Sequence, residues 1–243
     1  MALELLRPDW PAPARVRSLQ TLRGGGCSGA PWGSLNLGDH VGDDPQCVSR
    51  NRALIRGLLP AEPLWLKQVH GVAVADADRP LAMPEADAAI ARQPGKVCAV
   101  MTADCLPVLF CDRAGSVVAA AHAGWRGLLA GVLEATTDRM AVPPGELMAW
   151  LGPAIGAGAF EVGDEVRAAF VARDAAAASA FIPGAPGKWQ ADIYRLARQR
   201  LQTAGLGSIS GGERCTVSEP EHFFSYRRDG VTGRMASLIW LAD

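Results

Sequence analysis

Short apolar runs recur along the whole chain and predict β-strands. Three of them, residues 97–102, 108–111 and 117–121, are nearly continuous in apolar residues, which is typical of strands buried on both faces of a sheet. Weaker runs predict further strands at residues 16–22, 64–69, 72–75, 147–151 and 235–241. The predicted strands are therefore spread over nearly the full sequence.

Segments with apolar residues at helical spacing lie between these strands. Asp43 or Asp44 ahead of Pro45 is typical of a helix start, and this helix is expected to run to about Leu59. An alanine- and proline-rich stretch, residues 175–186, predicts a surface excursion. The interleaving of strands and helices favours a mixed α/β layered domain over a barrel. The other predicted helices span residues 124–140, 163–172 and 192–204.

Length and composition predict a single globular domain over residues 1–243. The chain has 243 residues, of which 49% are hydrophobic and 20% charged, so it can bury a sizeable core. Its net charge of −1, with Lys and Arg spread evenly, gives no electrostatic footprint for nucleic acid or for an acidic membrane. This charge favours a small or neutral substrate. Because we find neither an apolar stretch of roughly 18 residues nor a signal segment, we expect a cytoplasmic protein.

The six cysteines are expected to be reduced thiols. A chain of this size without a secretion signal has little need of disulfides. The cysteines form no C-x-x-C pair, which argues against a zinc ribbon or a thioredoxin-type redox site.

Two of the four histidines and one cysteine stand at the ends of apolar runs, beside small or turn-forming residues. His70 lies in the sequence QVHG, Cys105 in TADCLP and His122 in HAGWRG, where a predicted strand leads into a helix. Two histidines and a cysteine are an accepted ligand set for catalytic zinc, with a fourth position left open. The alternatives are three unrelated structural residues, or a metal-free pair in which His122 lowers the pKa of a nucleophilic Cys105.

Several polar residues are candidates for substrate binding or proton transfer. Asp104, next to Cys105, is the first candidate for carrying protons or orienting a histidine, with a plain turn aspartate as the alternative and Asp87 as a weaker candidate. Arginine side chains grip phosphate or carboxylate groups with two nitrogens. Arg23, beside a glycine-rich loop, is one such candidate, as are Arg227, Arg228 and Arg234 near the end of the chain.

The glycine-rich loop after Arg23 matches neither the Walker pattern nor the dinucleotide fingerprint. The sequence therefore gives no support for binding of ATP or NAD.

These motifs, in this order, resemble the YfiH family, whose members are variously labelled polyphenol oxidase, laccase-domain protein and purine nucleoside phosphorylase. The resemblance covers nearly the whole chain. Its motifs are residues 21–28 (TLRGGGCS), 35–37 (LNL), 40–45 (HVGDDP), 68–71 (QVHG), 102–107 (TADCLP), 121–127 (AHAGWRG) and 223–228 (FFSYRR).

The resemblance implies a four-layer α/β/β/α sandwich with a metal or cysteine site at His70, Cys105 and His122. It further implies phosphorolysis of adenosine, inosine and S-methyl-5′-thioadenosine, with adenosine deaminase activity at the same site. Purine nucleoside and phosphate are then the partners, and the chain is expected to be a monomer or a homodimer. On this hypothesis Arg23 and a second arginine such as Arg228 hold phosphate. Asn36 and Gln68 bind ribose or base, and Asp104, Cys105 and His122 are the catalytic residues.

Zinc is the favoured metal, although copper is possible. A multicopper laccase needs a blue-copper centre and a three-copper cluster with many more histidines, and this chain has four. A single copper with Met101 as axial ligand is conceivable. On one continuous strand, however, Met101 and Cys105 stand too far apart to share an ion.

Other functions remain open from the sequence. One alternative is a single-copper polyphenol oxidase. A second is a cysteine hydrolase that edits a peptidoglycan precursor, a role also attached to relatives in this family. A third is a non-catalytic protein that stores metal or interacts through it.

Overall fold

Two β-sheets stacked face to face form the centre of the molecule in the computed structural model, which describes residues 3–79 and 82–243. Strands of the first sheet come from both ends of the chain, with the last strand between β2 and β6. In spatial order this sheet contains β1 (Leu5–Leu6), β2 (Val16–Thr21), β14 (Met235–Leu241), β6 (Val97–Thr102) and β3 (Pro63–Leu64).

The second sheet is built mainly from the middle of the chain. Strands β7 and β8 form its centre and pair antiparallel, so that Pro107 lies opposite His122. In spatial order the sheet contains β13 (Ser208–Gly211), β9 (Leu147–Leu151), β7 (Leu106–Asp112), β8 (Val118–Ala123), β5 (Ala88–Ala91) and β4 (Val74–Asp76).

Strand β6 explains why the apolar runs are continuous. Its residues alternate between two hydrophobic clusters, as the two-residue period of a strand requires. Cys98 and Val100 face the second sheet, whereas Val97, Ala99 and Met101 face away from it. Both faces of the strand are therefore buried, and each of its residues is apolar except the last.

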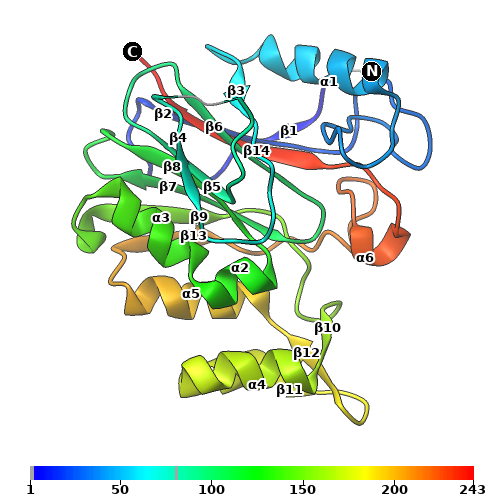
Figure 1. Ribbon diagram of the computed structural model, residues 1–243, viewed down its shortest axis with the longest axis vertical. Coiled ribbons are helices and arrows are strands. Elements are labelled where there is room, and N and C mark those ends of the chain that lie inside the picture. Colours follow the sequence, from blue (N-terminus) through cyan, green and yellow to red (C-terminus); the bar gives the residue numbers. More distant parts are fainter. Residues whose placement is uncertain (1–2, 80–81) are drawn as a thin grey trace.

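Helices cover the outer face of each sheet and complete four layers (Figure 1). Helix α1 (Pro45–Arg56) packs on the first sheet, and Asp44 caps its N-terminus by accepting a hydrogen bond from the N–H of Gln46. Three helices pack on the second sheet, α2 (Trp125–Ala130), α3 (Val132–Met140) and α5 (Ile193–Thr203). The prediction of a mixed α/β fold with an α/β/β/α order is confirmed.

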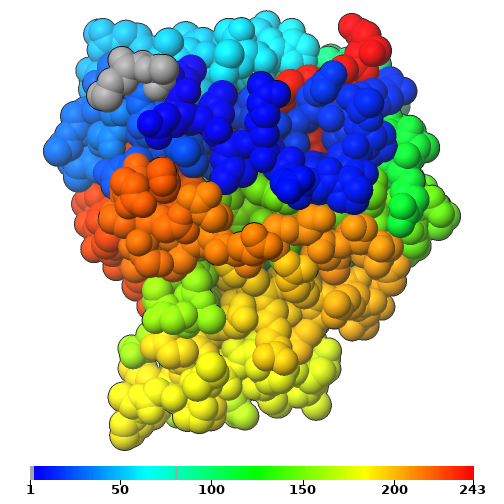
Figure 2. Space-filling view, turned by 180° about the vertical axis from the view of Figure 1, so that it is seen from behind, coloured from blue at the N-terminus to red at the C-terminus, as the bar shows by residue number. Residues whose placement is uncertain are grey.

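A small lobe projects from the second sheet (Figure 2, yellow). Its sheet has the order β10 (Glu161–Gly163), β12 (Lys188–Ala191) and β11 (Phe181–Pro183), and α4 (Asp164–Arg173) packs against it. The stretch predicted as a plain surface excursion instead forms a 3-10 helix, η2 (Ala175–Ala180), and strand β11. Burial of Ala177, Ala180 and Phe181 in the main apolar cluster stabilises this structure.

Other predicted boundaries also differ from the structure. The predicted helix 124–140 is two helices, because Gly131 adopts a left-handed φ of 109° between them. The predicted strand 64–69 ends at Leu64. The segment predicted as a loop around residues 225–230 contains a single helical turn, α6 (Tyr226–Asp229), after Ser225. A further 3-10 turn, η1 (Pro144–Glu146), precedes β9.

Among the described residues, every helix is too short or too polar to cross a membrane.

Candidate metal centre

Three turns of the chain bring His70, Cys105 and His122 together at one end of the sandwich. His70 lies in the loop between β3 and β4, Cys105 in the turn that passes from β6 in the first sheet to β7 in the second, and His122 near the end of β8. One donor atom of each lies within 4.8 Å of the others, and Cys105 Sγ is 3.7 Å from His70 Nε2. The structure therefore brings together the three residues that the sequence predicts as metal ligands.

The carboxylate of Asp87 holds two of these three residues in place. It is fully buried and accepts hydrogen bonds from the backbone N–H groups of Val69, His70 and Gly71, at 3.1, 2.9 and 2.7 Å. It also lies 2.7 Å from Nδ1 of His122. Because Nδ1–H donates to the carboxylate, Nε2 of His122 keeps its lone pair for a metal or a proton.

The backbone at His70 and Gly124 is shaped for close approach. His70 has a positive φ of 61°, which is uncommon for a residue with a side chain and is stabilised here by the bonds to Asp87. A Cβ atom on Gly124 would lie 2.6 Å from Cδ2 of His70 and 3.0 Å from Sγ of Cys105. Glycine is therefore required where β8 leads into α2.

Electrostatics favour a thiolate at Cys105 and a charged imidazole at His122. Burial acts to raise the pKa of the thiol, but the charge of His122 and hydrogen bonds from both histidines outweigh it and lower that pKa to about 6. Burial likewise acts to lower the pKa of His122, but the Cys105 thiolate and the Asp87 carboxylate raise it to about 9. In the absence of a metal these shifts favour a thiolate beside a charged imidazole.

The donor set and spacing fit a tetrahedral metal ion. Zinc bonds of about 2.3 Å to sulfur and 2.0–2.1 Å to nitrogen put two ligand atoms roughly 3.6 Å apart in a tetrahedron. The observed Cys105–His70 separation is 3.7 Å. His122 is buried, Cys105 partly exposed and His70 exposed, so the trio is open to solvent on one side. These three residues can therefore bind a metal and leave a position free.

A cavity of about 770 Å³ opens in front of the trio. Volumes of this size are typical of small-molecule sites. Its walls combine cationic and aromatic side chains. Burial lowers the pKa of the Arg234 guanidinium, partly offset by the charges of Cys105 and Asp104. The lining side chains that matter for the chemistry are His40, Trp125, Arg126, Phe160, Arg227 and Arg234.

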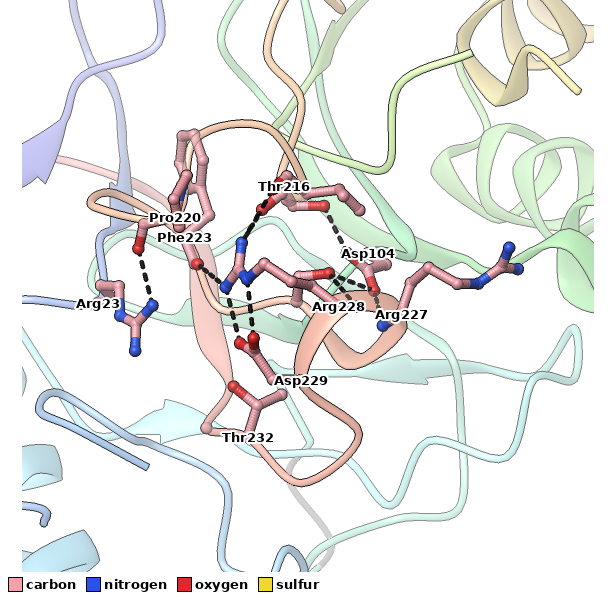
Figure 3. A network of polar contacts seen from close by, with 12 residues as sticks. Arg23, Asp104, Thr216, Pro220, Phe223, Arg227, Arg228, Asp229 and Thr232 are labelled. Atoms are coloured by element: carbon pink, nitrogen blue, oxygen red, sulfur yellow. Dashed lines mark hydrogen bonds and ion pairs between the residues drawn. The ribbon is translucent and has the colours of Figure 1, made fainter. Parts of the chain in front are cut away.

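The carboxylate of Asp104 points to the C-terminal segment of the chain (Figure 3). It accepts hydrogen bonds from Thr216 Oγ1 at 2.5 Å, Ser225 Oγ at 3.0 Å and the N–H of Arg227 at 2.6 Å. These bonds satisfy both oxygens and fix α6 at the rim of the cavity. Asp104 also lines the cavity, but its oxygens bond the protein and neither histidine, whereas Asp87, the weaker candidate, is the carboxylate within hydrogen-bond distance of His122.

Two arginines expected to hold phosphate make structural bonds to backbone carbonyls instead. Arg228 donates to the carbonyls of Thr216, Val217 and Phe223, and it also pairs with Asp229 (Figure 3). Arg23 donates to the carbonyls of Gly33 and Pro220. Neither side chain lines the cavity.

The two amides expected to bind ribose or base are also held by the protein. Asn36 is fully buried, where it bonds Gly38, Asp43 and the N–H of Arg234. Gln68 does line the cavity, but both ends of its amide bond the backbone of Met101 at 2.8 and 2.7 Å. Gln68 therefore ties the His70 loop to β6.

The chain is similar over nearly all of its length to proteins with assigned names. A family model described as multi-copper polyphenol oxidoreductase laccase matches residues 17–242. A Pseudomonas aeruginosa protein named purine nucleoside phosphorylase is 60% identical over 239 residues, covering 98% of each chain. The purine nucleoside phosphorylase YfiH of Escherichia coli is 58% identical over 98% of this chain and 99% of its own.

Two crystal structures share the fold. One, of a Neisseria meningitidis protein, superposes with a TM-score of 0.96 at 55% identity and covers 98% of this chain and 99% of that one. The other, of YlmD from Geobacillus stearothermophilus, has a TM-score of 0.89 at 30% identity, with coverage of 98% and 96%. The similarity thus includes both sheets and the lobe.

Asp87→Asn is expected to weaken zinc binding about 10- to 100-fold, because an amide cannot serve the three N–H donors and the His122 ring as a carboxylate does. Competition with a chelating dye measures the affinity. Asp112→Asn is the matched control, since this buried carboxylate accepts N–H bonds from Ser116 and Val117 at the far end of β7. Equal zinc affinity in Asp87→Asn and wild type would contradict the role of Asp87.

Gly124→Ala is expected to lower the amount of bound metal while the protein stays folded, since the new methyl group displaces His70 and Cys105. Elemental analysis per protein chain measures this loss. Gly158→Ala is the control, because a Cβ atom at Gly158 meets nothing within 4 Å. A full metal equivalent in Gly124→Ala would show that the contact is harmless.

Alkylation of Cys105 in metal-free protein is expected to accelerate as pH rises, with a midpoint at about 6. The lowered pKa makes the thiolate dominant above that pH and the unreactive thiol dominant below it. Iodoacetamide labelling followed by peptide mass spectrometry gives the rate at each cysteine. Cys111, whose pKa burial raises to about 12, is the internal control. A midpoint near 8.5 for Cys105 would contradict the lowering of its pKa by His122.

Proposed function

Because this chain belongs to the YfiH family, we propose that it is a purine nucleoside phosphorylase acting on adenosine, inosine and S-methyl-5′-thioadenosine. One observation carries the proposal: a metal-binding trio and three arginines face one cavity of about 770 Å³. Relatives 58–60% identical over nearly the whole chain bear the same activity in their names. An anionic co-substrate and a largely apolar base suit this cavity.

Arg126, Arg227 and Arg234 are the proposed phosphate ligands, in place of Arg23 and Arg228. Arg227 is anchored by a bond from Nη1 to the carbonyl of Glu161, and Arg234 by bonds from Nη1 to the carbonyls of Thr232 and Gly233. A guanidinium carries five N–H donors, so each retains donors on its other nitrogens. Pre-positioned guanidinium groups bind phosphate with both charge and geometry.

An apolar part of the cavity is the proposed seat of the purine. Ile155, Phe160 and Ile193 line it together with Trp125. The Arg227 guanidinium lies 5.6 Å from the centre of the Phe160 ring, so the proposed phosphate and purine subsites adjoin. A nucleoside bound across both would expose the bond between sugar and base to phosphate.

Zinc is the proposed metal at His70, Cys105 and His122. A zinc ion supplies Lewis acidity, which can activate water or polarise a purine substituent, the chemistry that adenosine deamination at the same site needs. The chain's own contribution is to hold the imidazole of His122 with Nε2 facing the trio through Asp87. Copper, which the family description suggests, meets the same three donors.

A cysteine hydrolase editing a peptidoglycan precursor is the second candidate function. The observation that favours it is the convergence of Cys105 and His122, whose donor atoms lie within 4.8 Å, because a thiol whose pKa is lowered by a neighbouring imidazole is the arrangement of cysteine nucleophiles. The two candidates respond oppositely to metal. Removal of the metal would leave a hydrolase active and sensitive to alkylation of Cys105, and would inactivate a metal-dependent enzyme.

The phosphorylase is tested by phosphate-dependent release of ribose 1-phosphate and hypoxanthine from inosine. His122→Ala is expected to lower kcat/KM about 100-fold, the order of loss when a positioned group is misplaced. Cys215→Ser is the control, because Cys215 lies outside this cavity with its Sγ bonded by the N–H of Gly156 at 3.2 Å.

Two results would refute the phosphorylase. One is inosine left intact by wild-type protein with phosphate and zinc present. The other is equal activity in His122→Ala and wild type, which would place the reaction elsewhere.

A further inference from the structure

A third histidine, His40, lines the cavity that contains the metal-binding trio. It follows a buried loop, residues 35–38, and its neighbour Asp39 lines the same cavity. The side chain of His40 is 56% exposed, so it is neither a core residue nor part of the trio. Its imidazole is therefore available to a bound molecule.

The carboxylate of Asp39 connects His40 to an anchored arginine. His40 Nδ1 lies 3.5 Å from one oxygen of Asp39, and Arg52 Nη2 lies 3.2 Å from the other. Arg52 is itself fixed, because its Nε donates to the carbonyl of Leu37 and its guanidinium stacks 4.5 Å from the Trp65 ring. The carboxylate thus lies on the Nδ1 side of the ring, which leaves Nε2 as the nitrogen open to a bound molecule.

Arg234 contacts the loop that precedes His40 and also lines the cavity in front of the trio. The N–H of Leu37 bonds the carbonyl of Arg234 at 3.1 Å, and a Cβ atom on Gly38 would lie 2.8 Å from Cγ of Arg234. Arg234, a proposed phosphate ligand, also lines the cavity. The histidine therefore stands on the wall that continues from the proposed phosphate site.

We propose that His40 is the catalytic acid that protonates the purine as it leaves, an assignment that rests on the proposed phosphorylase function. Phosphate oxygen forms a bond to C1′ of the ribose, the bond from C1′ to the purine nitrogen breaks, and its electron pair passes to the base. His40 donates a proton to N7, so the purine departs neutral. Hydrogen phosphate loses one proton on becoming ribose 1-phosphate, and this proton balances the one that His40 regains from solvent.

Imidazole suits this task. General acid catalysis by a positioned side chain contributes about 10²- to 10⁴-fold, and histidine performs it most often near neutral pH. The exposure of His40 lets solvent restore its proton after each turnover. A ring nitrogen that binds a metal cannot donate a proton, so the metal-binding nitrogens of His70 and His122 are excluded from this role.

The test uses two nucleosides that differ in their need for an acid. Inosine requires protonation of its base, whereas 7-methylinosine already carries a positive charge on the purine and leaves without it. In zinc-loaded protein, His40→Gln is expected to lower kcat on inosine about 100-fold and kcat on 7-methylinosine less than about fivefold. His222→Gln is the control, since His222 does not line the cavity.

The possible outcomes separate this assignment from the function on which it rests. A selective loss on inosine, with unchanged thermal stability and zinc content, supports His40 as the acid. Equal losses on both nucleosides, or no loss on either, overturn the assignment while wild-type activity upholds the phosphorylase. A wild-type protein inactive on both nucleosides overturns the proposed function, and the assignment with it.

Discussion

The pairing of the Asp87 carboxylate with the His70 loop and the His122 ring is the interaction on which the site depends. Asp87 directly precedes β5, whose register against β8 places it beside His122, and the N–H of His122 bonds its carbonyl at 2.7 Å. A shift by one residue would turn the carboxylate to the other face of the sheet. Correct pairing of β5 with β8 therefore also places the carboxylate that holds two of the three metal-binding residues.

A second polar network stabilises the rim of the cavity and holds the backbone of Arg227, a proposed phosphate ligand. Asp104 ties the turn that contains Cys105 to Thr216 and α6, and Arg228 binds the carbonyls around them. Arg23 links the N-terminal loop to Pro220. Distant parts of the chain are thus joined by side chains that resemble substrate ligands in sequence, because charged residues in polar loops serve both purposes.

The sequence predicts most elements and the metal trio, but it does not predict their supports. Apolar periodicity finds β6 and α5, and turn residues beside His70, Cys105 and His122 indicate a site. Strand β5 is missed because its sequence, AAIA, is mostly alanine and has a single β-branched residue, Ile90. Unless β5 is predicted, the sequence does not indicate that Asp87 lies beside His122. The roles of Asp104 and Arg228 depend on contacts more than 10 residues away in sequence, which spacing does not record.

One thiolate links the two candidate functions. The His122 charge that lowers the pKa of Cys105 makes this sulfur both a good metal ligand and a good nucleophile. A metal held by the trio occupies the lone pairs that nucleophilic attack would use, so occupancy decides which chemistry is open to the cavity. The three arginines on its walls are anchored outside the trio, two by backbone carbonyls and one by an aromatic ring. An anionic substrate or co-substrate is consequently the requirement that both functions share.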